Sequence, residues 1–258
     1  MKISRRQFLI ASAIATGGAV VAGGGAMFTR FKNMDPFNMY VESTQEVLTV
    51  HFGDDLAEII HKETWQEYEA LLPQVPDIGG ENNLNAENLL VSAYCLAKYR
   101  VLKARGQTTE EVGKIIYESY EAVADLPGWL GGIMGRLRYG RKYQEYLREQ
   151  AIQSQKRQYP GDWVFTFVEG DGEAFDYGLD FTECGICKLY HAQGADELTP
   201  YMCLSDYVIG KAFDRGFVRH KTLAEGAGVC DFRYKVGRES FVYPLRDGWP
   251  PKFLNEGV

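Results

Sequence analysis

The sequence predicts an α+β protein of one domain, in which N-terminal helices precede a mostly antiparallel sheet with two cysteine-bearing helices. Apolar residues recur at helical spacing through the first half of the chain, whereas short segments rich in aromatic and β-branched residues fill the second half. No Pro- or Ser-rich linker separates the halves and no repeat is visible. We therefore expect one domain over 40–245 and a C-terminal tail over 246–258.

Four helices are expected in the first half, over residues 54–73, 85–106, 108–128 and 140–158. Pro73 stops the first helix and Gly106 is a plausible terminator for the second. Thr108 and Glu111 have the spacing of a capping box at the start of the third. Cys95 lies on an apolar helix face and is expected to pack in the core.

The second half combines strands with two helices. Strands are expected over 163–168 and 173–181, helices over 184–194 and 196–213, and a closing hairpin over 217–226 and 229–236. Within the last strand, Cys230, Phe232 and Tyr234 alternate with Asp231 and Arg233. Alternate residues of a strand face the same side, so Cys230 should point toward the apolar face.

The charge pattern argues against nucleic acid as a partner. The formal charge is −7, and no basic stripe interleaved with aromatic residues is present. Lys and Arg gather only over 135–150, where acidic residues dilute them, which favours a solvated helix face.

Residues 1–30 have the pattern of an export signal. A basic start is followed by Ser4-Arg5-Arg6-Gln7-Phe8-Leu9 and then by a weakly apolar run of Ala, Gly and Val. This resembles a twin-arginine signal and predicts the twin-arginine export machinery as a partner. The protein is then expected in the periplasm or on the outer side of the cytoplasmic membrane, with membrane contact only through an uncleaved N-terminus.

Six short motifs in the second half resemble a known family. They are TEC (182–184), GADELTP (194–200), CLSD (203–206), GFVR (216–219), TLAEG (222–226) and CDFR (230–233). In this order they resemble the L-2-amino-thiazoline-4-carboxylic acid hydrolase family. The resemblance implies a small-molecule substrate, whose 2-aminothiazoline ring is opened by water to give an N-carbamoyl cysteine.

The cysteines provide the candidate catalytic groups. Cys184, Cys203 and Cys230 lie on separate elements, and Asp206 and Asp231 lie close to the last two in sequence. One cysteine could act as a thiolate nucleophile, with an aspartate or His191 as its acid–base partner. Among the charged side chains of the hairpin region, we single out Arg219, Glu225 and Arg233 as candidate substrate-binding residues, since arginine binds carboxylates in a bidentate manner.

A metal site is the second interpretation of the same residues. Cys184, Cys187 and His191 have the i, i+3, i+7 spacing of one helix face, and Cys203 and Cys230 could complete the ligand set. The expected metal is a divalent ion such as zinc, which would activate a bound water.

Two alternatives stay open from the sequence. The protein could be a non-catalytic exported module that binds a metal or cofactor, or has a redox function, through Cys184, Cys187, Cys203 and Cys230. It could also be a domain stapled by disulfides, Cys184–Cys187 or Cys203–Cys230, after export.

Overall fold

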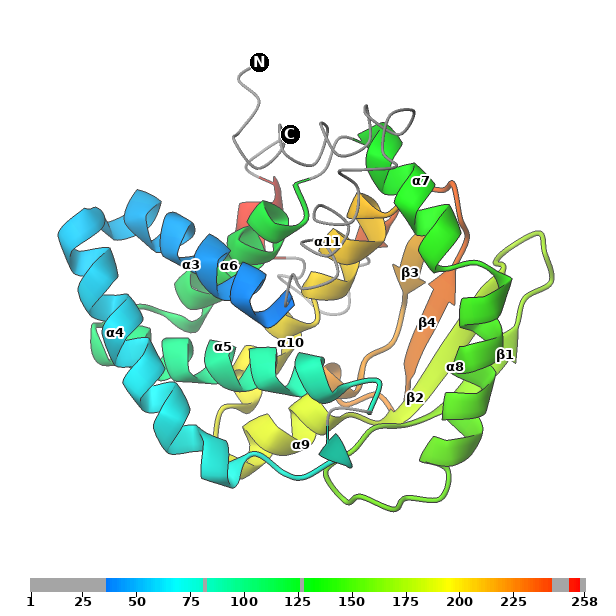
Figure 1. The fold of residues 1–258 in the computed structure, drawn as a ribbon, viewed down its shortest axis with the longest axis horizontal. Helices are drawn as coiled ribbons and strands as arrows, with labels where there is room; N and C mark the ends of the chain where they lie inside the picture. Colours follow the sequence, from blue (N-terminus) through cyan, green and yellow to red (C-terminus); the bar gives the residue numbers. More distant parts are fainter. Residues whose placement is uncertain (1–35, 81–82, 126–127, 243–250, 256–258) are drawn as a thin grey trace, which may run out of the picture.

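The computed structural model describes residues 36–80, 83–125, 128–242 and 251–255. The α+β fold is confirmed: a helical layer lies beside a five-stranded sheet of order β1-β2-β4-β3-β5 (Figure 1). The expected export signal lies outside the described residues. Among the helices of the described ranges, none is long and apolar enough to span a bilayer.

Four helices form the layer on one side of the molecule. They are α3 (Pro36–Phe52), α4 (Asp54–Leu71), α5 (Ala86–Ala104) and α6 (Thr109–Val123). The last three confirm the sequence prediction, and the capping box of Thr108 and Glu111 is formed. Together their apolar faces make the first hydrophobic core, the helical core, in which α5 buries 12 of its 19 residues and Cys95 is inaccessible to solvent.

Two helices escaped prediction. Helix α3 buries Ser43 and Thr44 together with its apolar residues, so its apolar pattern is interrupted. Helix α7 (Gly128–Arg138) contains four glycines, which have low helix propensity. Helix α8 (Arg141–Ser154) lies within the range expected for the fourth helix.

The sheet is antiparallel except at one edge. Strand β1 (Val164–Glu169) pairs with β2 (Tyr177–Glu183), β2 pairs with β4 (Cys230–Tyr234), and β4 pairs with β3 (Phe217–Arg219). The short β5 (Phe241–Val242) runs parallel to β3. The second strand begins later than predicted because Asp171 accepts the backbone N–H groups of residues 173–175 and holds them in a turn.

One face of the sheet forms a second core, the sheet core. Aromatic residues from four strands pack there against α8 and α11 (Ser205–Ala212). Cys230 pairs with Phe181 across β2 and β4, and Phe181 packs against both hydrophobic cores. Cys230 is buried, as its alternation with Phe232 and Tyr234 predicted.

The second cysteine-bearing helix is broken, contrary to the single helix expected over 196–213. A 3₁₀ turn (Asp196–Leu198) and a four-residue helix, α10 (Thr199–Met202), precede α11. The break falls at residues 203–204, where the Ser205 hydroxyl donates to the Met202 carbonyl. Helix α9 (Gly185–Ala192) is formed as expected and ends before Gly194, which adopts a left-handed φ of 64°.

A lysine lies at the centre of the helical core. The Lys98 side chain is fully buried, and its Nζ donates to the Tyr40 hydroxyl at 3.1 Å and the Thr44 hydroxyl at 3.2 Å. It also lies over the Tyr40 ring at 4.9 Å from the centroid. Burial lowers the pKa of Lys98 from 10.5 to about 8, because the charged ammonium loses its hydration.

This burial predicts a pH dependence of stability. The pKa of Lys98 is about 8 in the folded protein and 10.5 in the unfolded chain. Between these two pH values the unfolded chain binds more protons than the folded protein, so the contribution of Lys98 to stability rises with pH. The difference in unfolding free energy between the wild type and Lys98→Met should therefore shift by about 3 kcal/mol in favour of the wild type from pH 7 to pH 10.5. Urea unfolding at both pH values measures it. A pH-independent difference would contradict a buried lysine that titrates in this range.

Candidate active site

Three cysteines converge where the helical core meets the sheet core, a boundary we call the seam. Cys184 lies between β2 and α9, Cys203 lies between α10 and α11, and Cys230 begins β4. Their charges act on one another: a charge on Cys184 or Cys230 raises the pKa of the Cys203 thiol. All five cysteines of the chain are free thiols.

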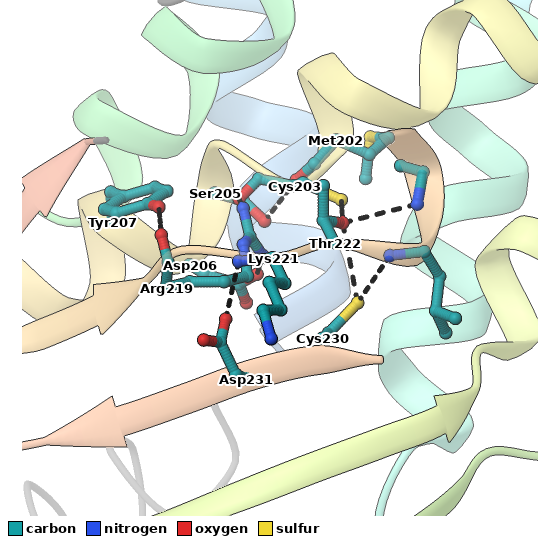
Figure 2. A network of polar contacts seen from close by, with 12 residues as sticks. Met202, Cys203, Ser205, Asp206, Tyr207, Arg219, Lys221, Thr222, Cys230 and Asp231 are labelled. Carbon is teal, nitrogen blue, oxygen red and sulfur yellow. Dashed lines mark hydrogen bonds and ion pairs between the residues drawn. The ribbon is translucent and has the colours of Figure 1, made fainter. Parts of the chain in front are cut away.

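Thr222 joins two of these sulfurs. Its hydroxyl lies 3.4 Å from the Cys230 Sγ and 3.9 Å from the Cys203 Sγ, as the dashed lines of Figure 2 show. The Leu223 N–H also donates to the Cys230 Sγ at 3.1 Å. Thr222 is itself fixed because its hydroxyl accepts the Ala224 N–H at the start of a short 3₁₀ turn (Leu223–Glu225).

Arg219 fixes the segment that carries Cys203 and Asp206. Its side chain is only 1% exposed, and its guanidinium donates to the Asp206 carboxylate at 2.8 Å and to the Cys203 carbonyl at 3.0 Å. The same group lies over the rings of Tyr207, Phe217 and Phe232. Arg219 therefore ties strand β3 to the helix break that carries Cys203.

Asp206 is the acidic group of the site. Burial raises the pKa of its carboxyl, although the charge of Arg219 opposes the shift. The Asp206 side chain keeps 37% of its exposure, so it remains open to solvent beside the buried guanidinium. Its charge also raises the pKa of Cys203 and acts against ionisation of Cys184.

Cys184 has a different environment from the other thiols of the seam. It occupies the N-cap position of α9, next to the Cys187 thiol and the N–H groups of Ile186 and Cys187. Hydrogen bonding from these groups lowers the pKa of the Cys184 thiol. The partly buried Cys187 has its pKa raised, because its thiol donates to Cys184 and loses hydration.

Gly185 holds the start of α9 close to the sheet. A Cβ at this position would lie 2.5 Å from the Trp163 ring and 2.8 Å from the Gly161 carbonyl oxygen. At the other end of α9, the Tyr190 hydroxyl donates to the Ser92 carbonyl of α5. Cys184 is thus held against the helical core, next to the segment that precedes β1.

The surroundings of Cys203 and Cys230 favour the protonated thiol. Burial raises the pKa of Cys203 to about 12 and raises that of Cys230, in spite of the nearby Arg219 charge. Among the three cysteines of the seam, Cys184 is the one whose surroundings favour a thiolate.

Four other predicted site residues have different surroundings. The exposed His191 contacts Asp196 at 3.0 Å. Arg233 pairs with Asp180 at 2.7 Å on the sheet face opposite Cys230. Asp231, on that same face, accepts the N–H groups of residues 220 and 221 and so fixes the loop before Thr222 (Figure 2).

Glu225, the fourth, ends the 3₁₀ turn that follows Thr222 and is partly buried.

No three His, Cys, Asp or Glu side chains within the described ranges are grouped as they would be around one metal ion. The zinc site stays a prediction.

Sequence reasoning missed two residues of the site. Thr222 begins a Thr-x-x-Glu pattern with Glu225, a signal for a capped turn that could have placed its hydroxyl near the neighbouring strand. Tyr207, whose hydroxyl donates to the Arg219 carbonyl, has no sequence signal that separates it from an ordinary core tyrosine.

Two hollows lie near the site. One of about 400 Å³ is lined by Thr109, Asp196, Glu197, Pro200, Tyr201 and Ala224, and so reaches the turn that holds Thr222. A smaller, polar one of about 120 Å³ lies between α8 and the start of β1 and includes Trp163. Neither of these two hollows is lined by a cysteine.

The fold and the site define an α+β protein with a cysteine cluster at the boundary of two cores. The model of the L-2-amino-thiazoline-4-carboxylic acid hydrolase family matches residues 88–234, which include all the cysteines described above. The chain belongs to this family of hydrolases. No curated protein and no solved structure matches it.

The thiol environments predict an order of reactivity. Cys184 should react with iodoacetamide at pH 7 at least about tenfold faster than Cys203 or Cys230, because the reaction needs a thiolate. Peptide mass spectrometry after timed labelling of the folded protein measures the three rates. Equal rates, or faster labelling of Cys203, would contradict a specific activation of Cys184.

Proposed function

We propose that this protein opens the ring of 2-aminothiazoline-4-carboxylate, or of a closely related cyclic amidine, with Cys184 as the nucleophile. Membership in the hydrolase family supports the reaction class. The observation that carries the choice of residue is the position of Cys184 at the start of α9, where hydrogen bonding lowers the pKa of its thiol.

In the first step, the Cys184 thiolate adds to the ring carbon between nitrogen and sulfur. The ring nitrogen takes up a proton, and the bond from the same carbon to the ring sulfur then breaks. The ring sulfur leaves as a thiol after it gains a proton. The intermediate is an isothiourea in which the substrate carbon is bonded to the Cys184 Sγ.

In the second step, water adds to that carbon and gives up a proton. The bond to the Cys184 Sγ breaks, the carbon becomes a urea carbonyl, and the thiolate is restored. The overall reaction consumes one water and yields N-carbamoyl cysteine, so no oxidant or reductant is required.

Asp206 is the proposed proton carrier for these steps. Burial raises the pKa of its carboxyl, and its partly exposed side chain can exchange protons with solvent. Arg219 contacts Asp206 and the Cys203 carbonyl from a fully buried position, so we assign it a positioning role in place of the substrate contact expected from the sequence. Cys203 and Cys230 belong to the same site through the Thr222 hydroxyl, which contacts both sulfurs.

Removal of the nucleophile provides the direct test. Cys184→Ser should lower kcat/KM for ring opening by at least about 10³-fold, because a serine hydroxyl stays protonated where a thiolate is needed. The released substrate thiol, titrated after removal of the protein, measures the rate, and mass spectrometry identifies the carbamoyl product.

Cys95→Ala serves as the matched control, since Cys95 lies in the helical core away from the seam. It should keep wild-type kcat/KM once the folded fraction has been measured by circular dichroism. Full activity of Cys184→Ser with the fold intact would exclude Cys184. Loss of activity in Cys203→Ser or Cys230→Ser alone would move the nucleophile to that residue.

A second candidate function is thiol–disulfide exchange. The specific observation is the Cys-x-x-Cys motif at the start of α9: Cys184 occupies the N-cap position, Cys187 lies in the first turn of the helix, and hydrogen bonding from the Cys187 thiol lowers the pKa of Cys184. Cys187→Ser discriminates the two functions. Ring opening should persist within about tenfold because serine can still donate to Cys184, whereas exchange would stop at a mixed disulfide with Cys184.

The location of the activity belongs to the same proposal. The twin-arginine pattern of residues 4–9 supports export of the folded protein to the periplasm or to the outer side of the cytoplasmic membrane. Fractionation of cells that express the full chain tests it, with Arg5→Lys/Arg6→Lys as the variant that should stay in the cytoplasm.

A further inference from the structure

Helix α7 carries a stripe of exposed apolar side chains. Trp129, Ile133 and Leu137 are 58%, 50% and 82% exposed, and their spacing of four residues aligns them along one face. Large apolar side chains that are exposed singly are common, but three in a row on one short helix are not. We call these three residues the α7 stripe.

The opposite face of α7 explains why the stripe points outward. A Cβ on Gly131 would lie 1.9 Å from the Ala212 carbonyl oxygen, and one on Gly135 would lie 1.9 Å from the Phe213 carbonyl oxygen. The helix backbone is therefore in close contact with the end of α11. At 3.6 residues per turn, the stripe lies roughly half a turn away from these two glycines.

Basic residues accompany the stripe. Residues 126–144 contain Arg136, Arg138, Arg141 and Lys142 and no acidic residue, in a chain whose formal charge is −7. All four basic side chains are exposed. Asp214, the acidic residue found next to Gly132, approaches α7 from the body of the protein. The sequence had indicated only a solvated face over 135–150; the structure adds the apolar stripe beside it.

Apolar residues with a tryptophan on one face and arginines beside them are typical of helices that lie in a membrane interface. A protein partner fits the dimensions less well. A helix of 11 residues is about 16 Å long, and one face of it is small beside the roughly 800 Å² per partner that a stable protein interface buries. A bilayer needs no complementary shape, and its anionic lipids match the positive charge.

We propose that α7 docks on the surface of an anionic lipid bilayer, with Trp129, Ile133 and Leu137 inserted among the acyl chains. Arg136 and Arg138 then lie at the level of the phosphates. This contact is separate from any anchor that residues 1–30 provide, and it does not depend on the chemistry proposed for Cys184. It holds the body of the protein in a fixed orientation on the membrane.

Vesicle binding of the full-length protein tests the stripe. Vesicles of phosphatidylcholine with about one third phosphatidylglycerol should bind the variant Trp129→Ser/Ile133→Ser/Leu137→Ser at least about tenfold more weakly than the wild type. The matched control is Val50→Ser/Ile59→Ser/Ile152→Ser, which removes three exposed apolar side chains from other helices and should bind as the wild type does. Residues 1–35 are present in the wild type and in both variants, so any contribution they make to vesicle binding is the same in all three proteins.

A second readout reports on the helix itself and stays valid if the triple variant folds poorly. Lipids brominated in the acyl chain should quench part of the tryptophan fluorescence of the wild type, and this part should be absent in Trp129→Phe. Arg136→Gln/Arg138→Gln should weaken binding to the anionic vesicles, with little change on pure phosphatidylcholine.

Three results would overturn the assignment. Equal vesicle binding by the stripe variant and its control would remove the stripe from the contact. Quenching that persists unchanged in Trp129→Phe would also show that the α7 stripe does not enter the bilayer. A wild type that is dimeric without lipid, together with a monomeric stripe variant, would assign the α7 stripe to a second copy of the chain.

Discussion

The buried guanidinium of Arg219 is the interaction on which the arrangement of the seam depends. It enters from strand β3, lies over three aromatic rings of the sheet core and makes two hydrogen bonds at the junction of α10 and α11. A buried charge costs several kcal/mol unless it is paired and hydrogen-bonded. The chain meets this requirement with the Asp206 carboxylate and the Cys203 carbonyl, so the positions of an acid and of a cysteine are fixed together.

Cys184 is placed by other means. Its position comes from the end of β2, the start of α9 and a glycine that lets both approach Trp163. Backbone and thiol hydrogen-bond donors surround its sulfur, while burial dominates around Cys203 and Cys230. The pKa values of identical side chains thus shift in opposite directions, because their local surroundings differ.

Much of this architecture could be predicted from the sequence. Helical spacing with clear stop signals located α4, α5 and α6, and alternation in β4 placed Cys230 on the buried face. Helix α7 was missed because its glycines serve close packing on α11, a contact that local propensity cannot reveal. The single helix expected over 196–213 failed for a related reason: the tertiary contact of Arg219 with the Cys203 carbonyl, together with the local bond from Ser205 to the Met202 carbonyl, favours the break at Cys203.

The candidate site, like the fold, could be predicted only where a local sequence pattern indicates it. Which cysteines come together was indicated by the order of the motifs, but which side of the sheet each charge faces was not. Arg233 and Asp231 alternate with the buried residues of β4 and so lie on the far face, where Arg233 pairs with Asp180 and Asp231 organises a loop. The role of Arg219 required knowledge of its complete burial, which no pattern of charges along the chain supplies.

The seam has a consequence for how the protein loses function. Cys184 packs against the helical core, whereas Cys230 and the Arg219 guanidinium belong to the sheet side, and Phe181 contacts both. Regions of a protein open with different free energies, so the boundary between two cores can open while the interior of each stays closed. Slight separation of the cores would disperse the thiols while every helix and strand persists. Heat inactivation would then precede the melting of secondary structure, and cooling would restore activity as fast as the cores dock again.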